Sequence, residues 1–198
     1  SRINELVRQL SGGSTWPTDV ATVSLVRRGA IWSVHDRGGP IDAHWLDYEF
    51  DDASWAKGPS PLGYGESDLG HEIAFGPDRD NKHPATYFRN RFEFTGDTPA
   101  QLRLRIRRDD GAAVYLNGKN ILRHHLPEAE ATDHLTFADT AVGDLEEKLY
   151  YTVDLDPTLL LADNILAVQV HQCNGKSSDL MFDLFLEYQP SSLNSPAE

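Results

Sequence analysis

The sequence contains very little cysteine, with Cys173 the one residue of that type among 198. One cysteine excludes an intrachain disulfide framework and the paired-cysteine spacing of zinc fingers. A lone thiol is most often a small, buried or half-buried side chain. We expect that role for Cys173, in preference to a catalytic nucleophile.

Long apolar segments and an excess of positive charge are also absent. No apolar run approaches the roughly 20 residues that cross a bilayer, so membrane insertion is not expected. No signal-peptide pattern stands at the start, and because the chain begins at Ser1 we expect a mature product or an excised piece. Acidic residues outnumber basic ones by 31 to 18. This balance argues against nucleic acid and anionic membranes as partners, and is compatible with a secreted or calcium-binding protein.

Alternating hydrophobicity is the feature that the chain has in abundance. From residue 86 onward, apolar and polar side chains alternate in several segments, which is typical of half-buried strands. The clearest apolar positions are Leu102, Leu104, Ile106, Leu149, Tyr151, Val153, Leu155, Leu166, Val168, Val170, Leu180, Phe182, Leu184 and Leu186. Six or more such strands with almost no helix predict an all-β protein, an antiparallel β-sandwich or jelly roll.

Composition divides the chain into three parts. Residues 1–22 have helical spacing of apolar side chains followed by a Ser/Gly-rich stretch, which predicts a short N-terminal helix and a linker from a preceding region. Residues 23–188 contain the predicted sandwich, and residues 189–198 form a Pro/Ser-rich tail expected to be disordered. Within the sandwich, residues 51–54 are expected to form one helical turn that pins Phe50 and Trp55 to the body.

The segment 107–118 combines two turn signals. The Asn-Gly pair at 117–118 predicts a hairpin, because a primed turn needs positive φ at both central positions. Earlier in the segment, Asp109 and Asp110 precede a glycine, and such a carboxylate pair can bind calcium and help to hold a sugar diol. The alternative is an Asx-type turn, in which a carboxylate accepts backbone N–H groups or pairs with the arginines at 107 and 108.

A second calcium candidate lies in the long irregular connection at residues 59–84. Asp78, Asp80 and Asn81 place oxygen-bearing side chains close together there, and a structural calcium ion would explain how such a loop is ordered. The twelve-residue loop of calcium sensors is absent. Ordinary turn capping is therefore the alternative.

Several segments, in order, resemble a known family. They are similar to the galactose-binding-like jelly roll found in the sugar-binding domain of family-two glycoside hydrolases, over roughly residues 23–188. They also resemble accessory modules of secreted bacterial metallophosphoesterases and polysaccharide-degrading enzymes. The segments that carry the resemblance are Phe50–Trp55, Pro61–Gly65, Phe75–Pro77, Thr86–Phe92, Asp110–Gly118, Leu159–Leu161, Asn164–Val170 and Ser177–Leu184.

The resemblance implies a fold, a location and a role. It implies a secreted or cell-surface protein and a non-catalytic, carbohydrate-binding-like accessory module that sits beside a catalytic domain in the same polypeptide. The alternative is a module that packs between domains and has no ligand of its own, because members of one fold differ in what they bind. A weaker likeness links the Asp-Asp-Gly stretch to the calcium-holding pair of protective-antigen-type lectin domains.

Polysaccharide or glycan binding requires aromatic platforms with polar neighbours. The candidate side chains are Trp32, His35, Trp45, Tyr64, Arg107 and His171, with Tyr87 as a further aromatic. The alternative for each aromatic is a place in the core, which we expect for Trp55. His171 and Asp183 occupy polar phases of their strands, so we expect them at a sheet surface. The arginines at 103, 105 and 107 are expected to form a solvated face, with acids nearby.

Catalytic patterns are scarce. No serine lies in a Gly-x-Ser-x-Gly elbow, and no glycine-rich loop is arranged to hold phosphate. The loop from His124 to His134 offers histidines and acids that could form a transition-metal site, yet it lacks the spacing of known zinc motifs. We expect no enzyme activity, with a metal-dependent hydrolase using this loop as the remaining alternative.

Overall fold

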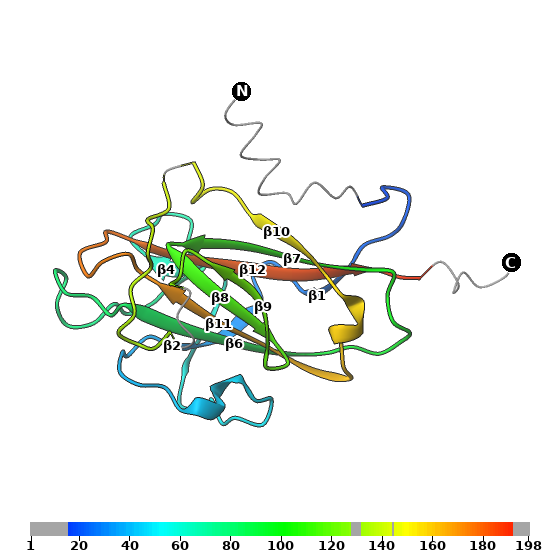
Figure 1. Ribbon diagram of the computed structural model, residues 1–198, viewed down its shortest axis with the longest axis horizontal. Helices are drawn as coiled ribbons and strands as arrows, with labels where there is room; N and C mark the ends of the chain where they lie inside the picture. Colours follow the sequence, from blue (N-terminus) through cyan, green and yellow to red (C-terminus); the bar gives the residue numbers. More distant parts are fainter. Residues whose placement is uncertain (1–15, 128–131, 144, 192–198) are drawn as a thin grey trace, which may run out of the picture.

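The computed structural model describes residues 16–127, 132–143 and 145–191. These residues form a β-sandwich of two stacked sheets, as predicted (Figure 1). Sheet A has the order β10-β7-β12-β4-β5, with β1 also paired to β12, and sheet B has the order β3-β2-β6-β11-β8-β9. All strand pairs are antiparallel except β4 with β5. The strands are β1 (Val23–Val26), β2 (Ile31–His35), β3 (Ala56–Pro59), β4 (Leu62–Tyr64), β5 (His71–Glu72), β6 (Ala85–Glu93), β7 (Gln101–Asp109), β8 (Gly111–Leu116), β9 (Lys119–His124), β10 (Tyr151–Leu155), β11 (Asp163–His171) and β12 (Leu180–Gln189).

The core lies between the sheets and is built from the alternating apolar side chains. Leu104 and Ile106 of β7 face inward and are fully buried. Phe182 of β12 stacks on Phe88 of β6 with ring centroids 4.1 Å apart, and Trp32 packs edge-on against Phe182 at 4.9 Å. Each such buried side chain contributes roughly 1.5–3 kcal/mol. The two sheets are therefore held mainly by this interior.

The hairpin predicted at residues 117–118 joins β8 to β9. Asn117 and Gly118 have φ values of 52° and 77°, as a primed turn requires. The Asn117 side chain also accepts from the Ile165 N–H at 2.9 Å and donates to the Leu159 carbonyl at 3.0 Å. The turn is thus fastened to the start of β11.

The helical turn predicted at residues 51–54 is wrong. Asp51 accepts from the Ala53 N–H at 2.9 Å, so its carboxylate closes a tight turn instead of capping a helix. A 3₁₀ helix, η1, occurs earlier at Ala43–Leu46, and a second, η2, spans Pro157–Leu159. The predicted contact between Phe50 and Trp55 does form, with ring centroids 5.8 Å apart.

The connection that contains η1 is attached to sheet B by a buried ion pair. The Arg89 guanidinium donates to Asp52 at 2.6 Å and to the carbonyl oxygens of Phe50 and Asp47 at 3.1 and 2.5 Å. Arg91 also reaches Asp52 at 3.0 Å. These bonds fix residues 47–52 against β6, below sheet B in Figure 1.

The outer sheet faces are more covered than the sequence pattern predicts. His171 and Asp183 are 0% and 2% exposed, so the expectation that they lie at a solvated surface is wrong. Loops cover both: the Thr136 carbonyl accepts from His171 Nδ1 at 2.7 Å, and the Tyr150 hydroxyl donates to Asp183. Arg103 is likewise buried and is paired with Asp154 at 2.6 Å.

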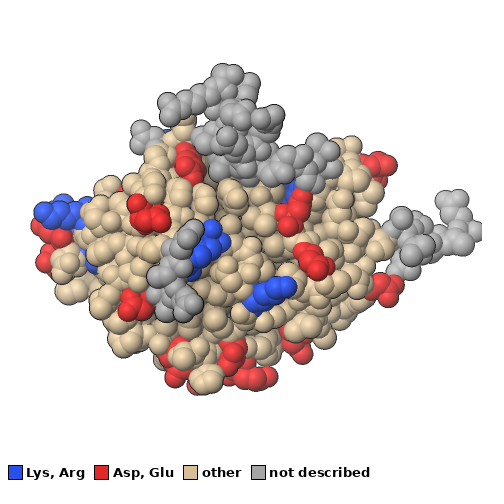
Figure 2. Space-filling model, viewed as in Figure 1, with Lys and Arg blue, Asp and Glu red and all other residues tan. Residues whose placement is uncertain are grey.

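The other two arginines of the 103/105/107 set form ion pairs with acidic side chains, as predicted. Arg105 pairs with Glu187 at 3.2 Å, and Arg107 pairs with Asp68 at 2.7 Å. Acidic side chains are scattered over the face seen in Figure 2, with few basic ones among them.

The two ends of the described chain meet at sheet A. β12 extends through Gln189, the first residue of the predicted tail. The Gln189 side-chain amide donates to the carbonyls of Pro17 and Val20 at 2.8 and 3.1 Å. The predicted N-terminal helix at residues 3–10 and the tail beyond residue 191 lie outside the described residues. No helix among the described residues is long and apolar enough to cross a membrane.

Candidate functional site

Several strand ends and connections that carry charged and polar residues meet at one end of the sandwich, on the left in Figure 1. Strands β7, β9 and β11 end there, and β8 and β12 begin there. The connections at residues 65–70, 125–150 and 172–179 meet these strand ends. Antiparallel pairing therefore brings together residues that are far apart in the sequence.

Asp110 is a structural link between two of these connections. It is 2% exposed, and its carboxylate accepts from the Val142 N–H at 2.8 Å and from the Cys173 N–H at 2.7 Å. Both carboxylate oxygens thus bind backbone donors. The carboxylate thus accepts backbone N–H groups, as in the alternative to a calcium site, but both donors are distant in the sequence, so the bonds do not form a local Asx turn.

Asp109 lies beside Asp110 and is 4% exposed. Burial, followed by the hydrogen bond to Asp110 and the charges of Asp110, Asp179 and Glu147, raises the pKa of Asp109 to about 9. The direction follows from physical chemistry, because a second negative charge in a buried pair is costly. The raised pKa favours the protonated form of Asp109 at neutral pH.

Three half-buried acids lie close to this pair and were not predicted from the sequence. Glu66, Glu147 and Asp179 each offer a carboxylate oxygen, and these oxygens lie within 4.8 Å of one another. The three residues come from three different connections, so no local sequence motif identifies them. This acid trio and the Asp109–Asp110 pair form one acidic end.

The second predicted calcium loop forms a turn. Asp78 Oδ1 accepts from the Asp80 N–H at 2.9 Å, and the Asn81 N–H donates to the Asp78 carbonyl at 3.1 Å. Nearby, Lys82 is buried, with its ammonium donating to the Arg79 carbonyl at 2.6 Å and lying 5.4 Å from the centre of the Phe75 ring. These contacts order the loop, and calcium binding there stays a prediction.

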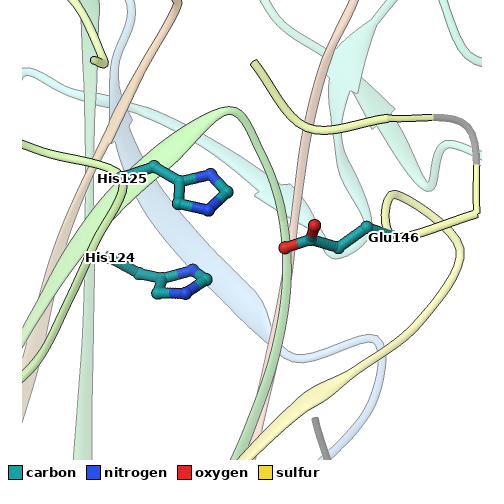
Figure 3. A group of neighbouring side chains, drawn as sticks. All are labelled: His124, His125 and Glu146. Carbon is teal, nitrogen blue, oxygen red and sulfur yellow. The ribbon is translucent and has the colours of Figure 1, made fainter. Parts of the chain in front are cut away.

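The histidines of the predicted metal loop do not all come together. His124 and His125 lie beside Glu146, with one ligand atom from each within 4.8 Å of the others (Figure 3). Asp133 instead bonds locally to Thr136 and the Leu135 N–H. Glu128 and Glu130, which belong to the same predicted set, lie outside the described residues.

An arginine already supplies positive charge to the group of His124, His125 and Glu146, which we call the histidine trio. Arg108 donates to Glu146 at 2.9 Å and also contacts His124 Nδ1. Burial, followed by the charge of Arg108, lowers the pKa of His124 to about 4 and also lowers the pKa of His125. The neutral rings stack 4.2 Å apart, and the positive charge of Arg108 beside them opposes the binding of a divalent cation.

The predicted aromatic platforms are buried. Trp32 lies in the core at 0% exposure, Tyr64 is 3% exposed, and Trp45 is 7% exposed. Arg107 is engaged by Asp68 at 2.7 Å and by the Glu147 carbonyl at 2.6 Å. A sugar ring needs an exposed aromatic face for stacking, so these side chains offer no open platform.

Three of the predicted binding residues do lie on the outer face of sheet B. His35 and Trp45 pack around Tyr87, with ring centroids at 6.2 and 5.1 Å. His171 lies on the neighbouring strand, β11. In the pairing of β11 with β6, Gln169 is opposite Tyr87 and His171 is opposite Ala85. Tyr87 Oη, His171 Nε2 and His35 Nδ1 are buried and have no hydrogen-bond partner among the described residues. Burial lowers the pKa of both histidines.

A surface cleft of about 400 Å³ lies elsewhere, between residues 25–31 and 90–92. It contains Arg27 and Arg28, but none of the residues predicted to bind a ligand. The Arg28 guanidinium lies 4.6 Å from the centre of the Tyr150 ring and 4.5 Å from that of Phe185. The residues that line this cleft are thus none of those that form the acidic end or the polar cluster on sheet B.

Comparison with known proteins gives structural matches only. No protein-family model matches the chain, and no curated protein matches it. A β-glucuronidase from Bacteroides uniformis matches with a TM-score of 0.55 and 16% identity, over 86% of this chain and 18% of that one. A second β-glucuronidase from glycoside hydrolase family 2 matches with a TM-score of 0.52 and 15% identity, over 87% and 18% of the two chains. A family-two member from Bacteroides cellulosilyticus has a TM-score of 0.50 and 13% identity, over 85% and 20%.

These matches concern architecture. The chain spans about a fifth of the length of the glycosidases that it matches. At such low identity the similarity shows the fold alone. The chain thus has the β-sandwich fold of a domain found in family-two glycosidases, as the sequence resemblance predicted.

Proposed function

We propose that this chain is a non-catalytic accessory module of a larger multidomain protein, and that its main role is to pack against a neighbouring domain. The observation that carries the proposal is the burial of Trp32, Trp45 and Tyr64, which removes the predicted sugar platforms from the surface. The matched glycosidases support the proposal. The part of each that resembles this chain makes up only 18% of its length, as expected for one domain of a larger protein.

Exposed apolar side chains on one connection suit such packing. Leu135, Phe137 and Leu145 lie between β9 and β10 and are 65%, 39% and 57% exposed. Scattered apolar residues are normal on a surface, but interfaces between domains bury side chains of this kind. We assign the docking face to residues 132–143 and 145–150 of this connection.

The packing role is tested with the domain that adjoins this one in the full-length protein. The isolated chain and the neighbouring domain are mixed, and their association is followed by sedimentation velocity. Phe137→Asp and Leu145→Asp should weaken association at least tenfold, while Leu161→Asp, an exposed residue near η2, should leave it unchanged. Equal effects of all three substitutions, or no association of the wild-type domains, would refute the proposal.

Glycan binding is the second candidate function, favoured by the polar atoms on sheet B. Tyr87 Oη, His171 Nε2 and His35 Nδ1 are buried without hydrogen-bond partners, and sugar hydroxyls both donate and accept. His35 and Tyr115 at the border of this cluster are only half-buried. A ligand that reached the cluster would thus satisfy several costly groups at once.

Tyr87→Phe tests this second candidate because it removes only the hydroxyl group. The variant should be as stable as the wild type or more stable, since the hydroxyl has no partner, and should lose binding in affinity electrophoresis or on a glycan array. Tyr150→Phe is the matched control, because the Tyr150 hydroxyl donates to Asp183 on the other sheet. If the wild-type protein binds no polysaccharide, glycan binding is excluded and only the packing role remains.

A further inference from the structure

The tripeptide Asn-Gly-Lys occurs twice in the chain, and the fold gives the two copies different surroundings. One copy is residues 117–119, at the hairpin between β8 and β9, and the other is residues 174–176, between β11 and β12. Asparagine is chemically labile, above all before glycine, because glycine has no side chain to hinder attack of its main-chain nitrogen on the asparagine amide. Since the copies match in sequence, a difference in their reactivity reports on the fold.

The Asn117 side chain is held by hydrogen bonds to another segment. Its Oδ1 accepts from the Ile165 N–H at 2.9 Å, and its Nδ2 donates to the Leu159 carbonyl at 3.0 Å and to Asn164 Oδ1 at 2.9 Å. The primed turn also fixes its main chain. The side-chain carbonyl carbon therefore cannot turn toward the Gly118 nitrogen without breaking bonds to the start of β11.

The Asn174 side chain is exposed and folds back over its own main chain. Its Oδ1 accepts from the Lys176 N–H at 2.8 Å, which makes an Asx turn. The Gly175 peptide group lies inside the ring that this bond closes, so the side-chain carbonyl carbon is a neighbour of the Gly175 nitrogen. The bond to Oδ1 also makes that carbon more electrophilic. Nδ2 donates to Cys173 Sγ at 3.1 Å, a weak acceptor.

The Gly175 nitrogen is available for reaction. No hydrogen bond uses its N–H within residues 16–127, 132–143 and 145–191, although the Gly175 carbonyl accepts from the Lys82 N–H at 2.9 Å. The second Asn-Gly pair thus combines an exposed amide, a favourable orientation and an unengaged nucleophile.

We propose that Asn174 is a site of spontaneous deamidation, while the fold protects Asn117. Water or hydroxide removes the proton of the Gly175 N–H, and the nitrogen forms a bond to Asn174 Cγ. The bond from Cγ to Nδ2 breaks, ammonia leaves, and a cyclic succinimide remains. Water then adds to either ring carbonyl and opens the ring. The products are an aspartate or an isoaspartate at position 174, and no oxidant or reductant takes part.

The isoaspartate lengthens the main chain of a connection that is anchored on both sides of the site. The Cys173 N–H donates to Asp110 at 2.7 Å, and the Lys82 N–H donates to the Gly175 carbonyl at 2.9 Å. An extra main-chain carbon between these anchors displaces one relative to the other, and the new carboxylate adds negative charge near Asp110. Isoaspartate formation should therefore lower the melting temperature by about 2–4 °C.

Trypsin separates the two copies, so mass spectrometry measures both in one sample. Cleavage after arginine and lysine gives peptides 109–119 and 149–176, each with one Asn-Gly pair. Purified protein is incubated at mildly alkaline pH, either folded or unfolded in guanidinium chloride. In folded protein, deamidation of 149–176 should be at least tenfold faster than that of 109–119, and fragment spectra should place it at Asn174. In unfolded protein the two rates should agree within threefold.

Two variants connect the reaction to position 174. Gly175→Ala should slow deamidation of 149–176 at least tenfold, because a methyl group hinders the attack. This variant should fold, since a Cβ at position 175 would lie 3.4 Å from its nearest neighbours, both atoms of Asn81. Asn174→Asp keeps an acceptor for the Lys176 N–H and the normal main chain, so it should melt within about 1 °C of the wild type. Aged wild-type protein, enriched in isoaspartate, should melt lower.

Three results would overturn the proposal. They are equal deamidation rates of the two peptides in folded protein, the same ratio of rates in folded and unfolded protein, and an unchanged rate in Gly175→Ala. An unchanged melting temperature of fully deamidated protein would contradict the loosening of the connection. Either function considered above can fail without affecting these results, since neither involves Asn174.

Discussion

At the scale of single residues, Asp110 shows how a functional motif in the sequence can serve the fold. The pattern of two acids before glycine suggested a calcium or sugar site, and the sequence left open whether the carboxylates would bind backbone groups. Asp110 holds the N–H groups of Val142 and Cys173, which come from two different connections. The spacing along the chain could not show this, because both donors lie more than 30 residues away.

Asp110→Ala should therefore destabilise the domain strongly. It leaves two buried N–H groups without acceptors, and each such loss costs about 1–3 kcal/mol. We expect the free energy of unfolding, measured with urea, to fall by roughly 2–5 kcal/mol. Asp51→Ala, which removes an exposed turn acceptor, is the control and should cost under about 1 kcal/mol. Equal costs for the two substitutions would contradict the linking role of Asp110.

The buried His171 gives stability a dependence on pH. Burial lowers its pKa from 6.5 to about 4, so between these values the unfolded chain binds a proton that the folded chain does not. Stability should consequently rise with pH across this window, by up to about 3 kcal/mol from this residue. His124, whose pKa is also lowered to about 4, acts in the same direction.

The contribution of His171 is isolated by comparing two proteins over pH 4–7. Asp109, with its raised pKa, has the opposite effect on stability, so the total slope alone is not diagnostic. His171→Asn keeps a donor for the Thr136 carbonyl but cannot take up the proton. Its stability should rise less steeply with pH than that of the wild type, and parallel curves would show that His171 does not titrate as described.

At the scale of elements, the connection between β2 and β3 depends on one ion pair. Asp52 and Arg89 are 7% and 0% exposed in their side chains and lie 2.6 Å apart. Arg89 alternates with the core residue Phe88 and therefore lies on the outer face of its strand, and residues 47–52, which no alternating pattern describes, bury it there. His171, Asp183 and Arg103 are likewise buried against expectation, because residues that alternation does not describe contact them on the outer sheet faces.

Breaking this pair should loosen the connection. Asp52→Asn leaves the Arg89 charge buried without its partner, and such a loss costs about 3–5 kcal/mol. We expect reduced stability in urea together with faster proteolysis within residues 41–55. Asp154→Asn is the control, since its partner Arg103 belongs to sheet A. Unchanged proteolysis in Asp52→Asn would show that aromatic packing alone holds the connection.

At the scale of the whole molecule, the sequence predicts the fold well and the sites poorly. Alternating apolar positions, the Asn-Gly hairpin and the ordered segments around Phe88, Val114 and Val168 all specify the two sheets. The acid trio and the histidine trio are instead assembled by strand pairing between connections, and no short motif encodes either. The aromatic residues were ambiguous because a tryptophan that binds sugar and one that fills a core look alike in the sequence.

In the full-length protein, we propose, the module packs against a neighbour through the connection between β9 and β10. Hydrogen exchange of backbone amides in residues 132–143 tests it most directly, with the isolated chain compared with the full-length protein. We expect slower exchange of these amides in the full-length protein, while the β8–β9 hairpin around Gly118 exchanges at the same rate in both. Equal exchange of residues 132–143 in the two proteins would contradict it.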